Sequence, residues 1–360
     1  MNWFFFFFCL SFSLTGQQIE LFIDWHSDAK GQTLFPLIEK ETSAEPALLS
    51  SLRSSLIQKK MDVCSWEKDK YYSWCLSWAA ISGWQDFKFW MGWDLPRKNP
   101  MLDKTSYWVF WGLGPQLKSF NFSRVNPKNL ILFLWEPPIV QPEGYDPKIQ
   151  KQFGKIFTWN DDLVDNIQFF KFYYPVLKPK IPNSPSFEVR KFCTLIASRL
   201  SSKHSNSLYE EREKIIRFFE NKPEDFALYG RFWEKRNFKN YKGPIPNKIE
   251  VLKNYKFCIC YENTKNMKGY ITEKIFDCFS SGTVPIYWGA SNIEDYIPKE
   301  SFIDRRQFLN DEDLYRFLKE ISKEQYECYL SSAEDFIKSK KARLFSVDHF
   351  ISTFISNVIQ

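Results

Sequence analysis

Residues 255–288 read YKFCICYENTKNMKGYITEKIFDCFSSGTVPIYW and place a strand, a helix and a second strand in immediate succession. The apolar run 255–260 predicts the first strand, residues 272–281 predict a helix that ends at Gly282, and residues 283–288 predict the second strand. This succession is the repeating unit of a doubly wound parallel sheet, so the fold class we predict is α/β. Such sheets bind ligands beyond the carboxyl ends of their strands, which is where the polar loop after the first strand lies.

The same alternation extends over both halves of the chain, and a proline-rich segment separates them. Strands over 191–197 and 226–229 flank a helix over 208–220, and shorter apolar runs with turn residues between them occupy the first half. Four prolines between residues 174 and 185 suit neither a helix nor a central strand and predict a linker. The domains we predict are a signal peptide or short membrane anchor at 1–16, an N-terminal domain at 17–174, a linker at 175–186, a C-terminal domain at 187–345 and a C-terminal helix at 346–360.

Composition excludes several classes of protein. With 44% hydrophobic and 26% charged residues, the chain of 360 residues is globular and neither disordered nor collagen-like. Its three histidines lie far apart, and its eight cysteines include no C-x-x-C pair. We therefore expect neither a zinc-hydrolase site nor a disulfide framework.

The chain begins with an apolar run over residues 3–14. This run is shorter than the roughly 20 residues that span a bilayer, and its length matches the apolar core of a signal peptide. No Lys or Arg precedes it, so a buried strand is the alternative interpretation. We expect membrane association or export through this segment, with a cytoplasmic location as the alternative.

The loop and helix start over 261–274 combine three features that suit an anion. Free backbone N–H groups and the positive end of the helix dipole meet the side chain of Lys274. Thr272 stands at the N-cap position, and Glu273 stands in the first turn. The segment therefore predicts a site for a phosphate or diphosphate, and the alternative is an ordinary capped surface helix.

This segment closely resembles the C-terminal signature of the α-1,3-fucosyltransferases, glycosyltransferase family 10. That family carries F-E-N-[ST], Y-[VI]-T-E-K, G-T-[VI]-P-[VI] and S-F-[IV] in this order. Here the four elements are YENT at 261–264, YITEK at 270–274, GTVPI at 282–286 and SFI at 301–303, with Tyr261 in place of the usual Phe.

The resemblance implies a GT-B architecture, in which two Rossmann-like domains face each other across a cleft and the C-terminal one holds GDP-fucose. It also implies an inverting fucosyltransferase that transfers L-fucose from GDP-fucose to a hydroxyl of a glycan acceptor, in α-1,3 linkage to N-acetylglucosamine or glucose. Fixed cations and a helix N-terminus can stabilise the leaving diphosphate, so we expect no required cofactor and no essential metal. The alternatives are a glycosyltransferase that uses another nucleotide sugar and a catalytically silent glycan- or nucleotide-binding protein.

The donor-binding residues of the family transfer to matching positions of this chain. In the family, the lysine of T-E-K and an upstream arginine hold the diphosphate, and the Asn, Tyr and Glu of the signature contact ribose or fucose. The donor-binding residues that the resemblance implies are Arg212, Asn263, Tyr270, Glu273 and Lys274. Arg199 is the alternative to Arg212, because the family's spacing before this arginine is stretched here.

Attack by an acceptor hydroxyl requires a carboxylate that takes its proton. Glu136 follows the predicted strand over 130–135, precedes two prolines and corresponds to the strand-end Glu proposed as the base in the family. We expect Glu136 to be the catalytic base, with Asp161 and Glu143 as alternatives.

Two further segments suggest other chemistry. Residues 311–313 form a D-x-D, the metal-diphosphate motif of GT-A glycosyltransferases, but they precede an apolar-periodic helix and are predicted to cap it. Residues 231–256 carry eight basic and two acidic side chains with aromatic residues between them, a composition also found in nucleic-acid-binding loops. We expect this basic segment to attract anionic GDP-fucose or to be a solvated loop, and we expect no nucleic-acid partner.

Overall fold

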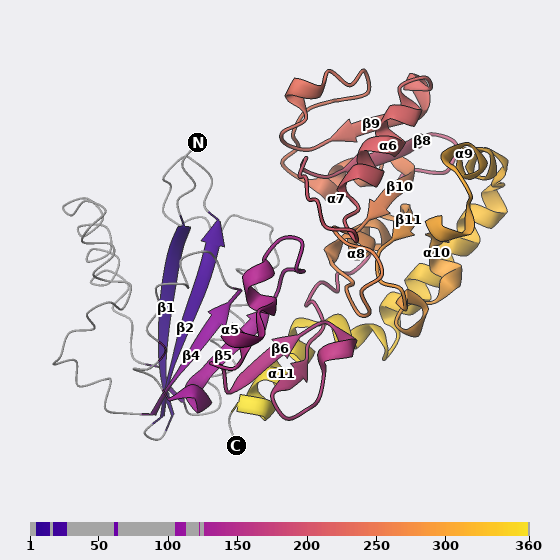
Figure 1. Ribbon diagram of the computed structural model, residues 1–360. Coiled ribbons are helices and arrows are strands. Elements are labelled where there is room, and N and C mark those ends of the chain that lie inside the picture. Colours follow the sequence, from indigo (N-terminus) through magenta and orange to yellow (C-terminus); the bar gives the residue numbers. More distant parts are fainter. Residues whose placement is uncertain are drawn as a thin grey trace. The chain divides into compact units, whose positions relative to one another are not determined.

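The computed structural model describes residues 5–14, 17–26, 61–63, 105–112, 122 and 126–358 (Figure 1). The chain divides into two compact units. The first contains the described residues up to Thr158, Leu163–Lys171 and the chain end from Asn357, and the second contains Trp159–Asp162 and Phe172–Ser356. Each unit is built around a largely parallel β-sheet with helices in the connections, which confirms the predicted α/β class.

The sheet of the first unit has the strand order β3-β1-β2-β4-β5-β6-β7. The strands are β1 (Phe5–Leu14), β2 (Gln17–His26), β3 (Met61–Val63), β4 (Thr105–Trp111), β5 (Leu130–Leu134), β6 (Lys155–Thr158) and β7 (Phe169–Lys171). β1 runs antiparallel to β2 and β3, whereas the neighbours from β2 to β7 are parallel. Every residue of β5 is buried, as expected for a strand covered on both faces.

Strand β1 occupies most of the segment for which the sequence predicts a signal peptide or membrane anchor. It pairs with β2 from Phe5 opposite His26 to Leu14 opposite Gln17. This pairing agrees with the strand alternative. In the part of the chain that the structure describes, no helix has both the length and the apolar character needed to cross a membrane. The signal or anchor at 1–16 is thus not supported by the structure and remains a prediction.

The sheet of the second unit is parallel throughout, in the order β12-β11-β10-β8-β9 (Figure 1). Its strands are β8 (Lys191–Ile196), β9 (Phe226–Tyr229), β10 (Tyr255–Tyr261), β11 (Val284–Trp288) and β12 (Ile303–Asp304). The chain adds β9 on one side of β8 and then adds the later strands on the other side. The carboxyl ends of β8 and β10 therefore flank the topological switch point, where doubly wound sheets bind ligands.

Helices connect these strands as the sequence predicts. Those after Phe172 are α6 (Tyr209–Phe219), α7 (Lys248–Leu252), α8 (Glu273–Ser281), α9 (Asp311–Glu320), α10 (Lys323–Lys338) and α11 (Val347–Val358). Helix α8 ends at Gly282, whose φ of 67° is the left-handed conformation that favours glycine, so its predicted end is confirmed. Helices α6, α9 and α10 pack on the sheet, where Ile216, Leu318 and Tyr326 join the same buried cluster as Phe257 of β10.

The proline-rich segment is part of the second unit and is not a free linker. The boundary between the units falls at Phe172, before the predicted linker at 175–186. Within that segment the N–H of Ile181 donates to the carbonyl of Ser280 on α8. Prolines exclude a helix or a central strand, but the N–H groups between them still form hydrogen bonds. The segment therefore packs against its own unit.

Candidate functional site

A cavity of about 30 Å³ lies beside the switch point of the second unit. Its walls come from the ends of β8 and β10 and from α6, α7 and α8. The lining residues are Leu195, Ile196, Ala197, Arg212, Lys248, Leu252, Cys258, Ile259, Cys260, Tyr261, Lys274, Asp277 and Cys278. This volume holds little more than one water molecule, so only one group of a larger ligand could enter it.

A buried carboxylate fixes Lys274 at the start of α8. Glu262 is fully buried, and its Oε2 lies 3.0 Å from Lys274 Nζ. Thr272 donates to Glu262 from its backbone N–H at 2.9 Å and from its hydroxyl, which in turn accepts from Lys274 Nζ at 2.9 Å. Thr272 thus stands at the predicted N-cap position, but its hydroxyl serves Glu262 and does not cap the helix. Burial favours a neutral Lys274, but the charges of Glu262 and Glu273 outweigh it and raise the pKa of Lys274.

Arg212 enters the same cavity from the buried face of α6. Its Nη2 donates to the Tyr261 carbonyl at 2.6 Å and to Asn263 Oδ1 at 3.0 Å. The side chain is buried, and its Nε has no hydrogen-bond partner among the described residues. Burial lowers the pKa of Arg212, and the guanidinium still carries its charge because its ordinary pKa is above 12.

Arg199, the alternative to Arg212, lies elsewhere. It follows β8, and its Nε lies 3.8 Å from Glu213 Oε2. Arg199 does not line the cavity. The structure therefore brings Arg212, and not Arg199, close to Lys274.

Asn263 and Tyr270 form the next layer around Arg212. Asn263 accepts from Arg212, and its Nδ2 lies 3.5 Å from the Tyr270 hydroxyl. The Tyr270 side chain is only 1% exposed, and its ring packs 4.6 Å from the ring of Trp159. Tyr270 is thus placed to support Asn263, whereas the resemblance implied that it touches the ligand directly.

Glu273 and Lys248 lie at the rim of the site. Lys248 Nζ is 3.5 Å from Glu273 Oε1 and 3.9 Å from Asp277 Oδ2. Desolvation opposes ionisation of Glu273, but the charges of Lys274 and Lys248 outweigh it and lower the pKa of Glu273. Burial raises the pKa of Asp277 despite the nearby charges of Lys248 and Lys178.

Three residues around Lys274 were not predicted from the sequence: Glu262, Lys248 and Asp277. Glu262 adjoins Asn263 in the signature, and an acidic residue between a strand and a lysine could have been read as the partner of Lys274. Lys248 was counted only as part of the basic segment, and Asp277 only as a helix residue. Neither of these two carries a local signal, because the fold alone brings α7 beside α8.

The predicted base, Glu136, lies in the first unit. It is half-buried in a bend two residues after β5, and its carbonyl accepts from the Tyr145 hydroxyl at 2.9 Å. Burial and the negative charge of Glu136 together raise the pKa of Tyr145. Glu143 is also half-buried, in a short 3-10 helix at Pro142–Tyr145.

The two aspartates of the D-x-D lie in the first turn of α9. The side chain of Asn310 caps this helix by accepting from the N–H of Asp313 at 2.8 Å. Asp311 pairs with Arg305 at 2.8 Å, and Asp313 lies 3.3 Å from Arg316. The capping role predicted for this region thus falls to Asn310, and both carboxylates meet arginines.

The basic segment has a partly structural explanation. Trp233 and Phe238 are buried in the core of the second unit, at 2% and 5% exposure. Phe232 is 49% exposed. Two of the aromatic residues that suggested stacking on bases therefore serve packing.

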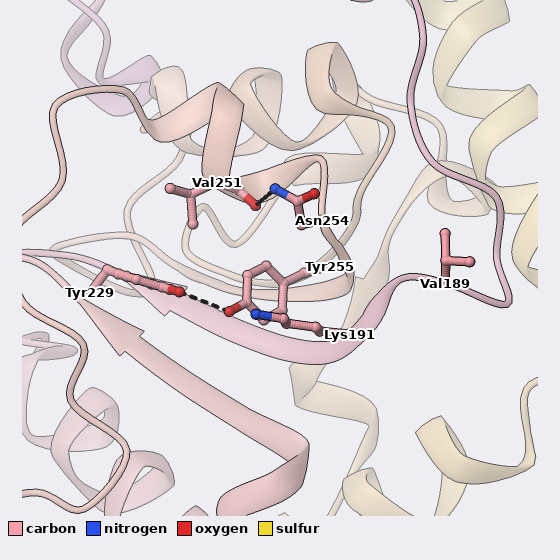
Figure 2. Close-up of a pocket in the computed structure, with 6 residues that line it drawn as sticks. All are labelled: Val189, Lys191, Tyr229, Val251, Asn254 and Tyr255. Atoms are coloured by element: carbon pink, nitrogen blue, oxygen red, sulfur yellow. Dashed lines mark hydrogen bonds between the residues drawn. The ribbon is translucent and has the colours of Figure 1, made fainter.

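A second, open pocket of about 360 Å³ lies near the starts of β8 and β10 (Figure 2). It is lined by Val189, Lys191, Tyr229, Val251, Asn254 and Tyr255. Figure 2 shows the Tyr229 and Tyr255 hydroxyls pointing toward one another, 2.9 Å apart. No predicted site residue lines this pocket.

The family model that matches this chain lies within the second unit. Residues 188–349 match the family model described as glycosyltransferase family 10 (fucosyltransferase) C-term. The alpha-(1,3)-fucosyltransferase FucT of Helicobacter pylori is 32% identical over 151 residues, which are 42% of this chain and 28% of that protein. The 4-galactosyl-N-acetylglucosaminide 3-alpha-L-fucosyltransferase 9 of Mus musculus is 38% identical over 195 residues, which are 52% of this chain and 49% of that protein. The chain thus spans half or less of the length of these relatives.

A solved structure supports the fold. The crystal structure of TarM is 12% identical, with a TM-score of 0.50 over 71% of this chain and 55% of that one. At a sequence identity of 12%, this similarity concerns the fold alone. Together with the two largely parallel sheets, it confirms the predicted GT-B architecture of two Rossmann-like units.

Proposed function

We propose that the chain is a fucosyltransferase of glycosyltransferase family 10 that uses GDP-fucose, because residues 188–349 match the model of that family. The observation that carries the proposal is the buried guanidinium of Arg212 beside Lys274, with an Nε that has no partner among the described residues. A buried N–H donor without an acceptor calls for an explanation, and an oxygen of a diphosphate would supply the acceptor. GDP-fucose places a diphosphate next to the bond that breaks.

On the donor side, this site would stabilise charge as it forms. Cleavage of the bond between C1 of fucose and the phosphate oxygen leaves the electron pair on GDP. Lys274 and Arg212 are already fixed by Glu262 and Asn263, so they can meet that charge without reorganising. The start of α8 adds its helix dipole.

On the acceptor side, we assign the base to Glu136. As the acceptor oxygen forms its bond to C1, its proton passes to the Glu136 carboxylate and GDP departs from the opposite face, which inverts the configuration at C1. The family resemblance and the position after β5 support this role. The alternative Asp161 has both carboxylate oxygens engaged by Asn292 and Tyr296.

The acceptor we propose is N-acetylglucosamine or glucose within a glycan, fucosylated in α-1,3 linkage. This choice is supported by the names of the relatives from Helicobacter pylori and Mus musculus. We further propose that no metal or other cofactor is required, because the side chains of Lys274 and Arg212 would neutralise the negative charge of the diphosphate.

The test is transfer of radiolabelled fucose from GDP-fucose, with and without N-acetyllactosamine, alongside UDP-galactose and UDP-N-acetylglucosamine as competing donors. We expect acceptor-dependent transfer from GDP-fucose only. Transfer from a UDP-sugar would favour the alternative of another nucleotide sugar. GDP binding without any transfer would favour a catalytically silent binding protein.

A further inference from the structure

A short segment, Trp159–Asp162, follows β6 in the chain and belongs to the second unit. It packs on the turn Lys268–Tyr270, which lies inside the family signature. Trp159 is fully buried, and its ring lies 4.6 Å from that of Tyr270. The N–H of Asp161 donates to the Lys268 carbonyl at 3.3 Å. Trp159 and Asp161 thus both contact the turn.

The carboxylate of Asp161 extends this connection through a second residue. Its Oδ2 accepts from Asn292 Nδ2 at 2.9 Å, and both oxygens accept from the Tyr296 hydroxyl at 2.7 Å. The other end of the Asn292 amide, Oδ1, accepts from the N–H of Gly269 at 2.9 Å. Because Asp161 receives the N–H₂ of Asn292, it determines which way that amide points. Only that orientation offers an acceptor to Gly269.

The Lys268–Tyr270 turn also places Tyr270 next to the proposed donor site. Gly269 has a φ of 79°, a conformation that glycine adopts without strain, and Tyr270 follows directly. The Tyr270 hydroxyl lies 3.5 Å from Asn263 Nδ2, and Asn263 Oδ1 accepts from Arg212. A chain of contacts therefore runs from Asp161 to the guanidinium of Arg212, entirely within the second unit.

We propose that Asp161 is a positioning residue for nucleotide-sugar binding, which acts by orienting Asn292 and so fixing the Lys268–Tyr270 turn. This inference rests on the proposed function of the site. It also gives Asp161 a role other than that of a base, because its oxygens face donors from Asn292 and Tyr296.

The decisive experiment removes the acceptor at position 161 and compares this change with a conservative one. Asp161→Leu leaves no acceptor at that position for the N–H₂ of Asn292, so the amide can turn and Gly269 loses its fixed acceptor. Asp161→Asn keeps one oxygen that can accept from Asn292 and from Tyr296, so it should preserve the orientation of the amide. The adjacent Asp162→Asn is the control, since Asp162 pairs only with the exposed ammonium of Lys268 among the described residues.

Two readouts separate this inference from the proposed function. Hydrogen exchange should be faster at Gly269 in Asp161→Leu, and normal in Asp161→Asn and in Asp162→Asn. Calorimetry should show GDP binding about tenfold weaker in Asp161→Leu, and within twofold of wild type in Asp161→Asn and in Asp162→Asn.

Unchanged GDP affinity in Asp161→Leu, or an equal loss of affinity in Asp161→Asn, would overturn the positioning role. A wild-type protein that binds no GDP would overturn the proposed donor instead. In that case, unchanged exchange at Gly269 in Asp161→Leu would still refute the contact pathway.

Discussion

Lys274 illustrates how single residues of the proposed donor site are held before any ligand binds. Its ammonium lies 3.0 Å from Glu262, 2.9 Å from Thr272 Oγ1 and 3.5 Å from Glu273. A cation fixed in this way loses little freedom when it binds an anion, and it needs no rearrangement as charge develops. The fully buried Glu262 is the residue that makes this possible.

Replacing Lys274 by Met removes the ammonium and keeps the length of the side chain. We expect GDP affinity to fall by about tenfold or more, because a charge-assisted hydrogen bond is lost. Isothermal titration calorimetry with GDP measures the change. Lys253→Met is the matched control, because Lys253 pairs with Glu250 at the end of α7 and does not line the cavity. Equal GDP affinity in the two variants would remove Lys274 from the site.

Glu136→Gln keeps the size and hydrogen-bonding shape of the side chain but cannot accept a proton. We expect turnover with acceptor to fall by about 10²- to 10⁴-fold, the usual contribution of a general base. GDP affinity should not change, because the donor residues belong to the second unit. Turnover of Glu143→Gln gives the comparison for Glu143, the alternative base in the first unit. Turnover of Glu136→Gln within a few-fold of wild type would assign the base elsewhere.

Among the elements, α8 carries the start of the donor site and depends on its C-terminal glycine. Gly282 adopts a φ of 67°, and a Cβ there would lie 3.2 Å from Arg190 Nη2. The Nη1 of the same arginine donates to the Gly282 carbonyl at 2.6 Å and to the Tyr255 carbonyl at 3.1 Å. Gly282 therefore ends the helix and also leaves room for a buried guanidinium.

We expect Gly282→Ala to lower the free energy of unfolding by about 1–2 kcal/mol, since alanine is strained in the left-handed region. Urea denaturation followed by circular dichroism gives the value. Gly243→Ala separates the two causes, because Gly243 has a φ of 95° and no atom within 4 Å of an added Cβ. A free energy of unfolding of Gly282→Ala equal to that of wild type would contradict the strain and the crowding at this position.

At the scale of the whole molecule, the proposed chemistry is divided between the two units. Arg212 and Lys274, which we propose for the leaving diphosphate, belong to the second unit, and Glu136, which we propose as the base, belongs to the first. The chain carries a net charge of +6, and residues 231–256 contain eight basic and two acidic side chains. Long-range attraction of an anionic donor would follow from this distribution and would weaken with salt.

Whether the complete transfer reaction needs a metal ion can be tested directly. We expect fucose transfer to continue in excess EDTA, because fixed cations would serve the diphosphate and Asp311 and Asp313 pair with arginines. The initial rate with and without EDTA is the measurement. The double variant Asp311→Ala with Asp313→Ala should retain transfer as well. Loss of activity in EDTA that returns on adding Mg²⁺ or Mn²⁺ would restore the metal role of the D-x-D.

The parts of the fold that sequence could predict are those with a local signal. The strand β10, the helix α8 and its end at Gly282 follow from periodicity and from one glycine within a short segment. The proline-rich segment shows the limit of such reasoning. Its prolines exclude regular structure, but they do not reveal that Ile181 bonds to Ser280 and so joins the segment to the second unit.

The sequence by itself determined the order of strands and helices in the second unit and the family signature around Lys274, because both reside in neighbouring residues. Only the tertiary structure decided that Arg212 and not Arg199 reaches the cavity, that Glu262 holds Lys274 and that Asp161 orients Asn292. Arg212 and the carbonyl it binds on Tyr261 are 49 residues apart, and Asp161 and Asn292 are 131 residues apart. No local pattern encodes such pairs, since packing of the whole sheet and its helices sets which distant side chains meet.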